Sequence, residues 1–220
     1  MIPYTLPFIL YLVLTQVPPA FPESYGWLYP VVVLVVVSVT VGLLHGRRLL
    51  CPHREVLPGV AVGLAGIAVW IVLSHLDLES SLRASLPGWL RPEERAGFNP
   101  FERIGDPVAR WGFMTIRLIG LVLLVPVAEE LFWRGFLIRW LISPNWQQQK
   151  PGQFTWFSFA GVTLLFALAH REWLAAAVYG GLLNGLWYWK RNLWTCVVAH
   201  AVSNLVLAGY ILATGNWQLW

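Results

Sequence analysis

Residues 121–141 read LVLLVPVAEELFWRGFLIRWL, an apolar run of the length that crosses a lipid bilayer as a helix. Inside this run lie two adjacent glutamates, Glu129 and Glu130, and an arginine, Arg134. A charged side chain near the centre of a bilayer costs roughly 3 kcal/mol even on the lowest scales, so charges inside a membrane mark pairing or functional roles. The stretch therefore predicts both a membrane-spanning helix and a site built on it.

The composition of the whole chain also indicates a membrane protein. Of its 220 residues, 57% are hydrophobic and only 12% are charged, and that charged fraction is about half of what is usual for a soluble domain. The 14 tryptophans fit a protein with many membrane–water interfaces, where indole rings concentrate. Two cysteines, Cys51 and Cys196, are too few for a disulfide framework, and no CxxC pair indicates a metal or redox centre. The N-terminus lacks the basic region and cleavage site of a signal peptide, so we expect the first apolar run to be retained.

Apolar runs along the chain predict an all-α fold, a polytopic transmembrane bundle of about seven to eight helices. Residues 108–141 are too long for one straight span, and Pro126 is expected to kink or divide them. Gly59, Gly63 and Gly66 offer a small-residue face for close helix contact. The expected spans are 3–20, 27–45, 58–76, 108–141, 154–170, 173–189 and 192–214.

Three parts of the chain differ in character. Residues 77–107 mix charges of both signs with prolines and tryptophans, which favours an amphipathic loop lying on the membrane surface. The parts are therefore N-terminal spans with this loop at 1–107, a helical core with intramembrane polar residues at 108–214, and a C-terminal tail at 215–220.

Basic residues in short loops indicate the orientation of the chain. If the spans alternate, three such loops lie on one face, which the positive-inside rule makes cytoplasmic, and the N-terminus falls on the same face. Because these cations form no dense stripe, the net charge of +4 does not indicate nucleic-acid binding. The loops hold Arg47, Arg48 and Arg54; Arg139 and Lys150; and Lys190 and Arg191.

The charges within the run 121–141 are expected to play different parts. Glu130 and Arg134 are spaced i, i+4, which places them on one helix face and permits an ion pair. Glu129 points about 100° away from that pair, so it stays available for chemistry. Elsewhere, Arg117 is expected to be structural or to snorkel toward the lipid boundary, and Asn184 to form a helix–helix contact.

Polar residues on two other helices are expected at a similar depth in the membrane. With a rise of 1.5 Å per residue, Glu129 lies about 20 Å from the loop at 142, and His170 about 24 Å from the other end of that loop. His200 and Asn204 lie about 12 and 18 Å from the turn at 192, on the same face. Phe166 is one helical turn before His170 and could form a wall of a shared cavity.

A carboxylate, two imidazoles and an amide in one cavity suit the hydrolysis of an acyl bond. A glutamate such as Glu129 can deprotonate water as a general base. Imidazole or amide hydrogens can stabilise the tetrahedral oxyanion that forms when the water attacks. The predicted activity is therefore hydrolysis inside a membrane.

Three short motifs carry a family resemblance. EELFWRG at 129–135 has the form EExxxR, FALAH at 166–170 has the form FxxxH, and HAVSN at 200–204 has the form HxxxN. In this order on separate helices, they resemble the CAAX protease and bacteriocin-processing family, the type II CAAX prenyl endopeptidase group, over roughly residues 108–210. The sequence of these motifs is also similar to that of CAAX-protease-related proteins that accompany bacterial exosortase systems.

The resemblance implies a glutamate-dependent intramembrane endopeptidase, with a CAAX protease-like catalytic core at 108–214. By the family's motifs, Glu129 would activate water together with His170. His200 and Asn204 would bind the oxyanion, and Glu130 and Arg134 would mainly hold the site together. The substrate would be a membrane-associated or lipid-modified protein, and the location a bacterial inner membrane with its lipids as partners. No nucleic acid and no cofactor is expected, and the oligomeric state is left open.

Other functions are compatible with the same residues. Two imidazoles and one carboxylate are a usual set of zinc ligands, and His170, His200 and Glu129 could supply them. No HExxH motif is present. A non-catalytic immunity factor or scaffold would keep the motifs only as architecture. A proton-coupled transporter would also place Glu and His in the membrane, but the chain shows no repeated halves.

Overall fold

The computed structural model describes residues 1–47, 49–50, 55–76, 78–79, 84–85, 87 and 97–219. Within this part of the chain every regular element is helical, which confirms the predicted all-α class. The main helices are α1 (Ile2–Leu14), α2 (Tyr25–Leu44), α3 (Val56–Leu76), α5 (Pro100–Arg103), α6 (Pro107–Ile119), α7 (Val125–Glu130), α8 (Ile138–Trp140), α9 (Trp156–Leu168), α10 (Trp173–Lys190) and α11 (Leu193–Thr214). Two π-helical segments, η4 (Gly120–Leu124) and η5 (Leu131–Leu137), join α6, α7 and α8, and four 3₁₀ turns lie at Pro18–Ala20, Pro22–Ser24, Trp146–Gln148 and Trp217–Leu219.

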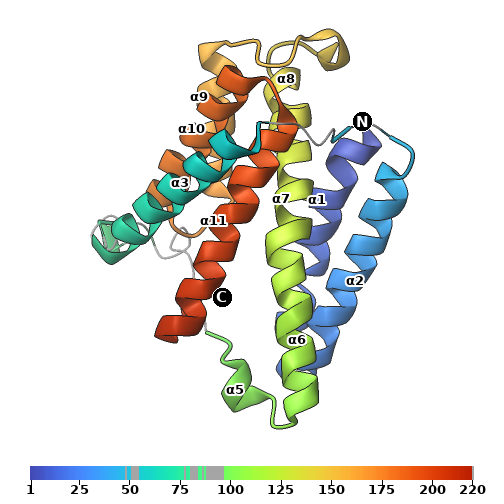
Figure 1. The fold of residues 1–220 in the computed structure, drawn as a ribbon, viewed down its shortest axis with the longest axis vertical. Coiled ribbons are helices and arrows are strands. Elements are labelled where there is room, and N and C mark those ends of the chain that lie inside the picture. The colour runs from blue at the N-terminus through green and yellow to red at the C-terminus, as the bar shows by residue number, and fades with distance from the viewer. Residues whose placement is uncertain are drawn as a thin grey trace.

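The helices form two groups on either side of one long helical segment (Figure 1). That segment, Pro107–Trp140, runs the height of the bundle and packs against α1 and α2 on one side. On the other side of the segment, α11 contacts α7 and η4. Helix α11 in turn packs closely against α3 and α10. The site-bearing segment is therefore enclosed from both directions.

Four helical segments are long and apolar enough to cross a membrane, among the residues that the structure describes. Of the other expected runs, 173–189 gives α10, which is not among the four, and 3–20 and 154–170 give α1 and α9, with 13 residues each. Such a helix is about 20 Å long, which is shorter than the roughly 30 Å hydrocarbon core of a bilayer. Prolines 18, 19 and 22 follow α1 and break its helical path. The four segments are Pro22–Leu44, Val56–Leu76, Pro107–Trp140 and Leu193–Thr214.

Pro126 does not divide the long segment, which continues from Pro107 to Trp140; a kink at Pro126 stays a prediction. It lies in the first turn of α7, directly after the π-helical η4. The N–H of Val125 bonds to the carbonyl of Gly120, five residues back, and Pro126 has no N–H to offer. The carbonyl of Leu121 is left without either donor, and the Asn204 side chain supplies one at 2.8 Å. The helix continues because a neighbouring helix replaces the hydrogen bond that proline cannot make.

The glycine face of α3 makes the close helix contacts that were predicted: Gly59 and Gly63 lie against α11, and Gly66 lies against Tyr179 of α10. A Cβ added to Gly63 would lie 2.5 Å from the Ala199 carbonyl oxygen, and one added to Gly59 would lie 2.7 Å from that of Thr195. Only glycine permits this approach. The Ser203 hydroxyl uses the short distance to donate a 2.8 Å hydrogen bond to the carbonyl of Gly63.

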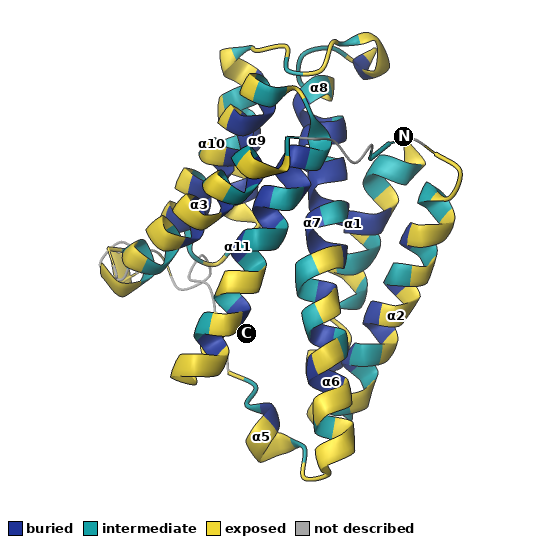
Figure 2. Ribbon diagram, viewed as in Figure 1, coloured by how far each residue is buried: buried dark blue, intermediate teal, exposed yellow. Residues whose placement is uncertain are grey.

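Buried residues gather where α7 and η5 meet α9, α10 and α11 (Figure 2). The outer faces of α2, α3 and α9 expose large apolar side chains, including Leu34, Val72 and Leu164. An apolar exterior of this extent suits contact with lipid tails rather than water.

The N-terminus, the ends of α2 and α8, and the turn between α10 and α11 lie at one end of the bundle (Figure 1). This geometry agrees with the grouping of basic loops, although Arg48 and Arg54 lie outside the described residues. About half of the expected surface loop 77–107 also lies outside them; its described C-terminal part contains α5.

Candidate functional site

Glu130 is fully buried at the end of α7 and joins two of the three sequence motifs. One of its carboxylate oxygens, Oε1, lies 3.0 Å from Nη1 of Arg134, which is the predicted i, i+4 ion pair. The same oxygen lies 3.0 Å from Nδ1 of His200 on α11. The first and third motifs therefore meet through direct contact at Glu130.

Arg134 lies in η5 with its guanidinium group fully buried. Besides Glu130, it donates from Nε to Oδ1 of Asn184 at 2.9 Å and from Nη2 to the carbonyl of Gly180 at 3.1 Å. Its charged group also lies over the Phe166 ring, 5.1 Å from the centroid. Such a set of partners is what a buried cation needs, because its desolvation must be offset by hydrogen bonds and charge pairing.

Glu129 faces a different environment from its neighbour, as the 100° rotation per residue predicts. It is 7% exposed, and its Oε2 accepts a 3.3 Å hydrogen bond from Nε1 of Trp133. The Trp133 ring packs edge-on against Phe8 of α1 and Phe166 of α9. Trp133 was not expected as a site residue, although its i, i+4 spacing from Glu129 could have indicated it.

His170 lies just beyond the end of α9, half-buried, and its ring stacks on Phe166 with centroids 4.3 Å apart. Its Nδ1 lies 2.7 Å from the carbonyl oxygen of Phe166. Because a carbonyl can only accept, Nδ1 carries the proton in this contact and a neutral ring has its lone pair at Nε2. Trp70 of α3 packs edge-on against the same imidazole.

Asn204 and His200 lie one turn apart on α11 but contact different partners. Asn204 donates through Nδ2 to the carbonyl of Leu121, which replaces the hydrogen bond that Pro126 cannot make. His200 is 4% exposed and lies edge-on to Tyr179, whose hydroxyl donates to Ser203 at 2.7 Å.

The structure thus joins some of the expected site residues directly and leaves others separate. Glu130, Arg134 and His200 form one hydrogen-bonded group, and Phe166 contacts both His170 and Arg134. Within the described residues no hydrogen bond joins Glu129 to either histidine. A shared water-filled pocket between them stays a prediction.

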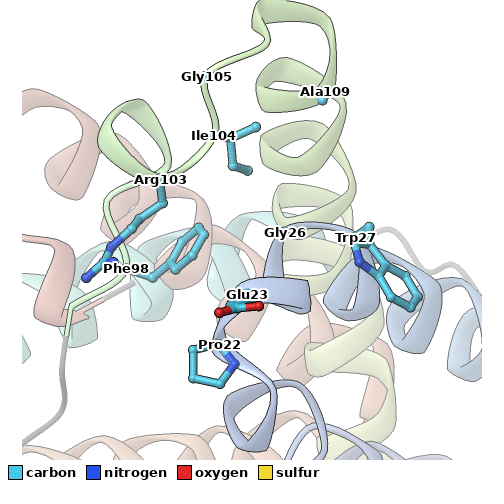
Figure 3. Close-up of a pocket in the computed structure, with 9 residues that line it drawn as sticks. All are labelled: Pro22, Glu23, Gly26, Trp27, Phe98, Arg103, Ile104, Gly105 and Ala109. Carbon is cyan, nitrogen blue, oxygen red and sulfur yellow. The ribbon is translucent and has the colours of Figure 1, made fainter.

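A hollow of about 430 Å³ lies elsewhere, at the opposite end of the bundle from the N-terminus (Figure 3). It is open to the surface between the start of α2 and the α5–α6 connection, and it contains none of the expected site residues. It is lined by Pro22, Glu23, Gly26, Trp27, Phe98, Arg103, Ile104, Gly105 and Ala109.

The residues of the zinc alternative are not clustered in this structure. Among the described residues no three His, Cys, Asp or Glu side chains are grouped closely enough to hold a metal ion. Glu129, His170 and His200 therefore do not form such a group in this arrangement.

Two other polar residues take structural roles that the sequence allowed for. Arg117 is not at the lipid boundary: it is 6% exposed, donates to the Tyr25 hydroxyl at 2.8 Å and lies 4.6 Å from the centroid of the Tyr29 ring. Asn184 does join helices, through a 3.0 Å hydrogen bond to Thr163 of α9, but it also accepts from Arg134.

Comparison with protein families gives one match that covers all three motifs. Residues 111–206 match the model described as type II CAAX prenyl endopeptidase Rce1-like. Comparisons with curated proteins and with solved structures found no match. The matched range begins in α6 and ends in α11, just beyond Asn204, so it includes Glu130, Arg134 and His200 in their mutual contact. Over residues 111–206, the chain is therefore similar to the Rce1-like type II CAAX prenyl endopeptidase family.

Proposed function

We propose that this membrane protein, of a CAAX protease-type family, is an intramembrane endopeptidase that cleaves a membrane-associated or lipid-modified protein in a glutamate-dependent reaction. The observation that carries the proposal is the direct contact between Glu130 and His200. It brings the helix of the EExxxR motif against the helix of the HxxxN motif, with Glu129 one residue away and buried. The end of the bundle that holds the N-terminus would face the cytoplasm of a bacterial cell.

In the proposed reaction Glu129 takes a proton from water, and the resulting hydroxide attacks the scissile carbonyl carbon. The C–N bond then breaks, and the proton passes to the leaving amine. His170 suits the first step, because its Nδ1 is occupied by the Phe166 carbonyl and its Nε2 is left to accept a hydrogen bond from water. The reaction as written needs no metal ion.

His200 and Asn204 would stabilise the tetrahedral oxyanion. With Nδ1 donating to Glu130, a neutral His200 has no proton at Nε2, so it would donate to the oxyanion only as an imidazolium. Asn204 uses its amide nitrogen for the Leu121 carbonyl, and the second hydrogen of that nitrogen would serve the oxyanion. Glu130, Arg134 and Phe166 would support these groups.

The experiment compares purified wild-type protein with the Glu129→Gln variant on a candidate bacterial membrane proteome, followed by mapping of new C-terminal peptides. Glutamine keeps the shape of the side chain and removes the base. Fragments produced only by the wild type would identify the reaction and the substrate together. Identical fragment sets from both proteins, with both proteins folded, would instead favour the immunity, scaffold or transport alternatives.

A further inference from the structure

Beyond the three motifs, the Arg134 side chain has a partner on α10 that the motifs do not include. Asn184 is completely buried, and its Oδ1 accepts from Nε of Arg134 at 2.9 Å. We propose that Asn184 is a positioning residue that orients the Glu130–His200 pair through Arg134. The proposal rests on the peptidase function above.

The guanidinium group of Arg134 is held on several sides by hydrogen-bond acceptors. Arg134 donates from three different nitrogens, to Glu130, Asn184 and the carbonyl of Gly180. Gly180 and Asn184 are one turn apart on α10, so the two acceptors hold the planar fork along one face of that helix. With Nε and Nη2 held in this way, Nη1 is left with a single direction, toward Glu130.

Asn184 itself cannot rotate freely. Its Nδ2 donates to the Thr163 hydroxyl at 3.0 Å, and the carbonyl of Phe159 lies at 3.5 Å from the same nitrogen. These acceptors on α9 turn the amide so that its oxygen faces Arg134. The orientation follows from the partners, since a guanidinium group only donates and a carbonyl only accepts.

The Asn184 side chain is uncharged. An amide oxygen accepts from Arg134 without carrying a full negative charge, so the Arg134 cation is paired with the carboxylate of Glu130. An aspartate at position 184 would have nearly the same shape but would compete with Glu130 for that cation. The contacts thus run from Thr163 through Asn184, Arg134 and Glu130 to the imidazole of His200.

The test uses Asn184→Asp and, as the milder variant, Thr163→Val, which removes only the outer hydroxyl. Asn145→Asp adds the same charge in an exposed loop and serves as the matched control. In a peptidase assay on the substrate identified above, Asn184→Asp is expected to lower kcat roughly 10- to 100-fold with little change in KM, as for other residues that support a site indirectly. Thr163→Val should lower kcat by less than about tenfold, and Asn145→Asp should match the wild type.

A second readout does not depend on activity. Histidines labelled with ¹⁵N report the state of each ring by NMR, and the His200 signal is assigned as the one lost in His200→Gln. That signal should shift in Asn184→Asp and in Thr163→Val but not in Asn145→Asp. An unchanged His200 signal in folded Asn184→Asp or Thr163→Val overturns the positioning role, even if no substrate is found. A shifted signal in a protein that cleaves no substrate overturns the peptidase function and leaves the positioning role standing. Unchanged kcat, or a loss confined to KM, also contradicts the inference.

Discussion

Two buried arginines on the same 34-residue helical segment have different surroundings. Arg134 pairs with the carboxylate of Glu130 and, through it, reaches His200. Arg117, nearer the start of the segment, meets the hydroxyl of Tyr25 and the ring of Tyr29 on α2. The first arrangement connects the helices that carry the motifs, whereas the second fastens the long segment to the N-terminal helices. A buried charge in a membrane protein can thus serve a site or serve packing, and its partners distinguish the two.

The largest expected effect is a difference in protein stability between variants of these two arginines. Arg134→Met leaves Glu130 buried without its cation, which should lower the free energy of unfolding by about 3–5 kcal/mol. Arg117→Met removes a hydrogen bond and a cation–π contact and should cost about 1–3 kcal/mol. Denaturant unfolding in detergent micelles measures both.

A second substitution provides the control for this prediction. Adding Glu130→Gln to Arg134→Met removes the uncompensated carboxylate, so part of the lost stability should return. Equal losses for the two arginine variants, or no recovery in the double variant, would show that the partners of the two cations do not matter as argued.

Two glycines extend the comparison to the flanking helices. Gly63→Ala would place a methyl group 2.5 Å from the Ala199 carbonyl, and forcing α3 away from α11 should cost about 1–3 kcal/mol. Gly42 of α2 has open space around a Cβ, so Gly42→Ala should instead stabilise the protein by about 0.5–1 kcal/mol. Thermal unfolding of both variants checks the signs; destabilisation by Gly42→Ala would contradict the view of α2 as loosely packed there.

A last expected effect, on activity, concerns the place where the two groups of helices meet. Trp133 packs on Phe8 of α1 while its N–H donates to Glu129. Trp133→Phe keeps most of the ring contact and removes the donor, so kcat should fall about tenfold, equivalent to a hydrogen bond worth about 1.4 kcal/mol. The exposed Trp140→Phe is the matched control in the same kinetic assay. Equal kcat values for the two variants would remove Trp133 from the site.

Local spacing predicted part of this architecture and long-range contacts decided the rest. The i, i+4 relation was sufficient for the Glu130–Arg134 pair, and the glycine spacing was sufficient for the face of α3. No local pattern could show that His200 would contact Glu130, because that depends on how two distant helices are rotated about their axes. The path of the helix through Pro126 depended on a π-helical turn and on Asn204, 78 positions later in the chain. The sequence predicts a helix contact at Asn184 but not its bond to Arg134, because that bond also joins distant segments.

The most direct measurement is the rate of peptide-bond cleavage by wild-type and Glu129→Gln protein in lipid bilayers with excess chelator. A metal-independent glutamate base predicts full activity of the wild type under chelation and a loss of at least about 100-fold in the variant. A variant that cleaves as fast as the wild type would contradict the role of Glu129, and a wild type that stops on chelation would contradict the metal-free reaction.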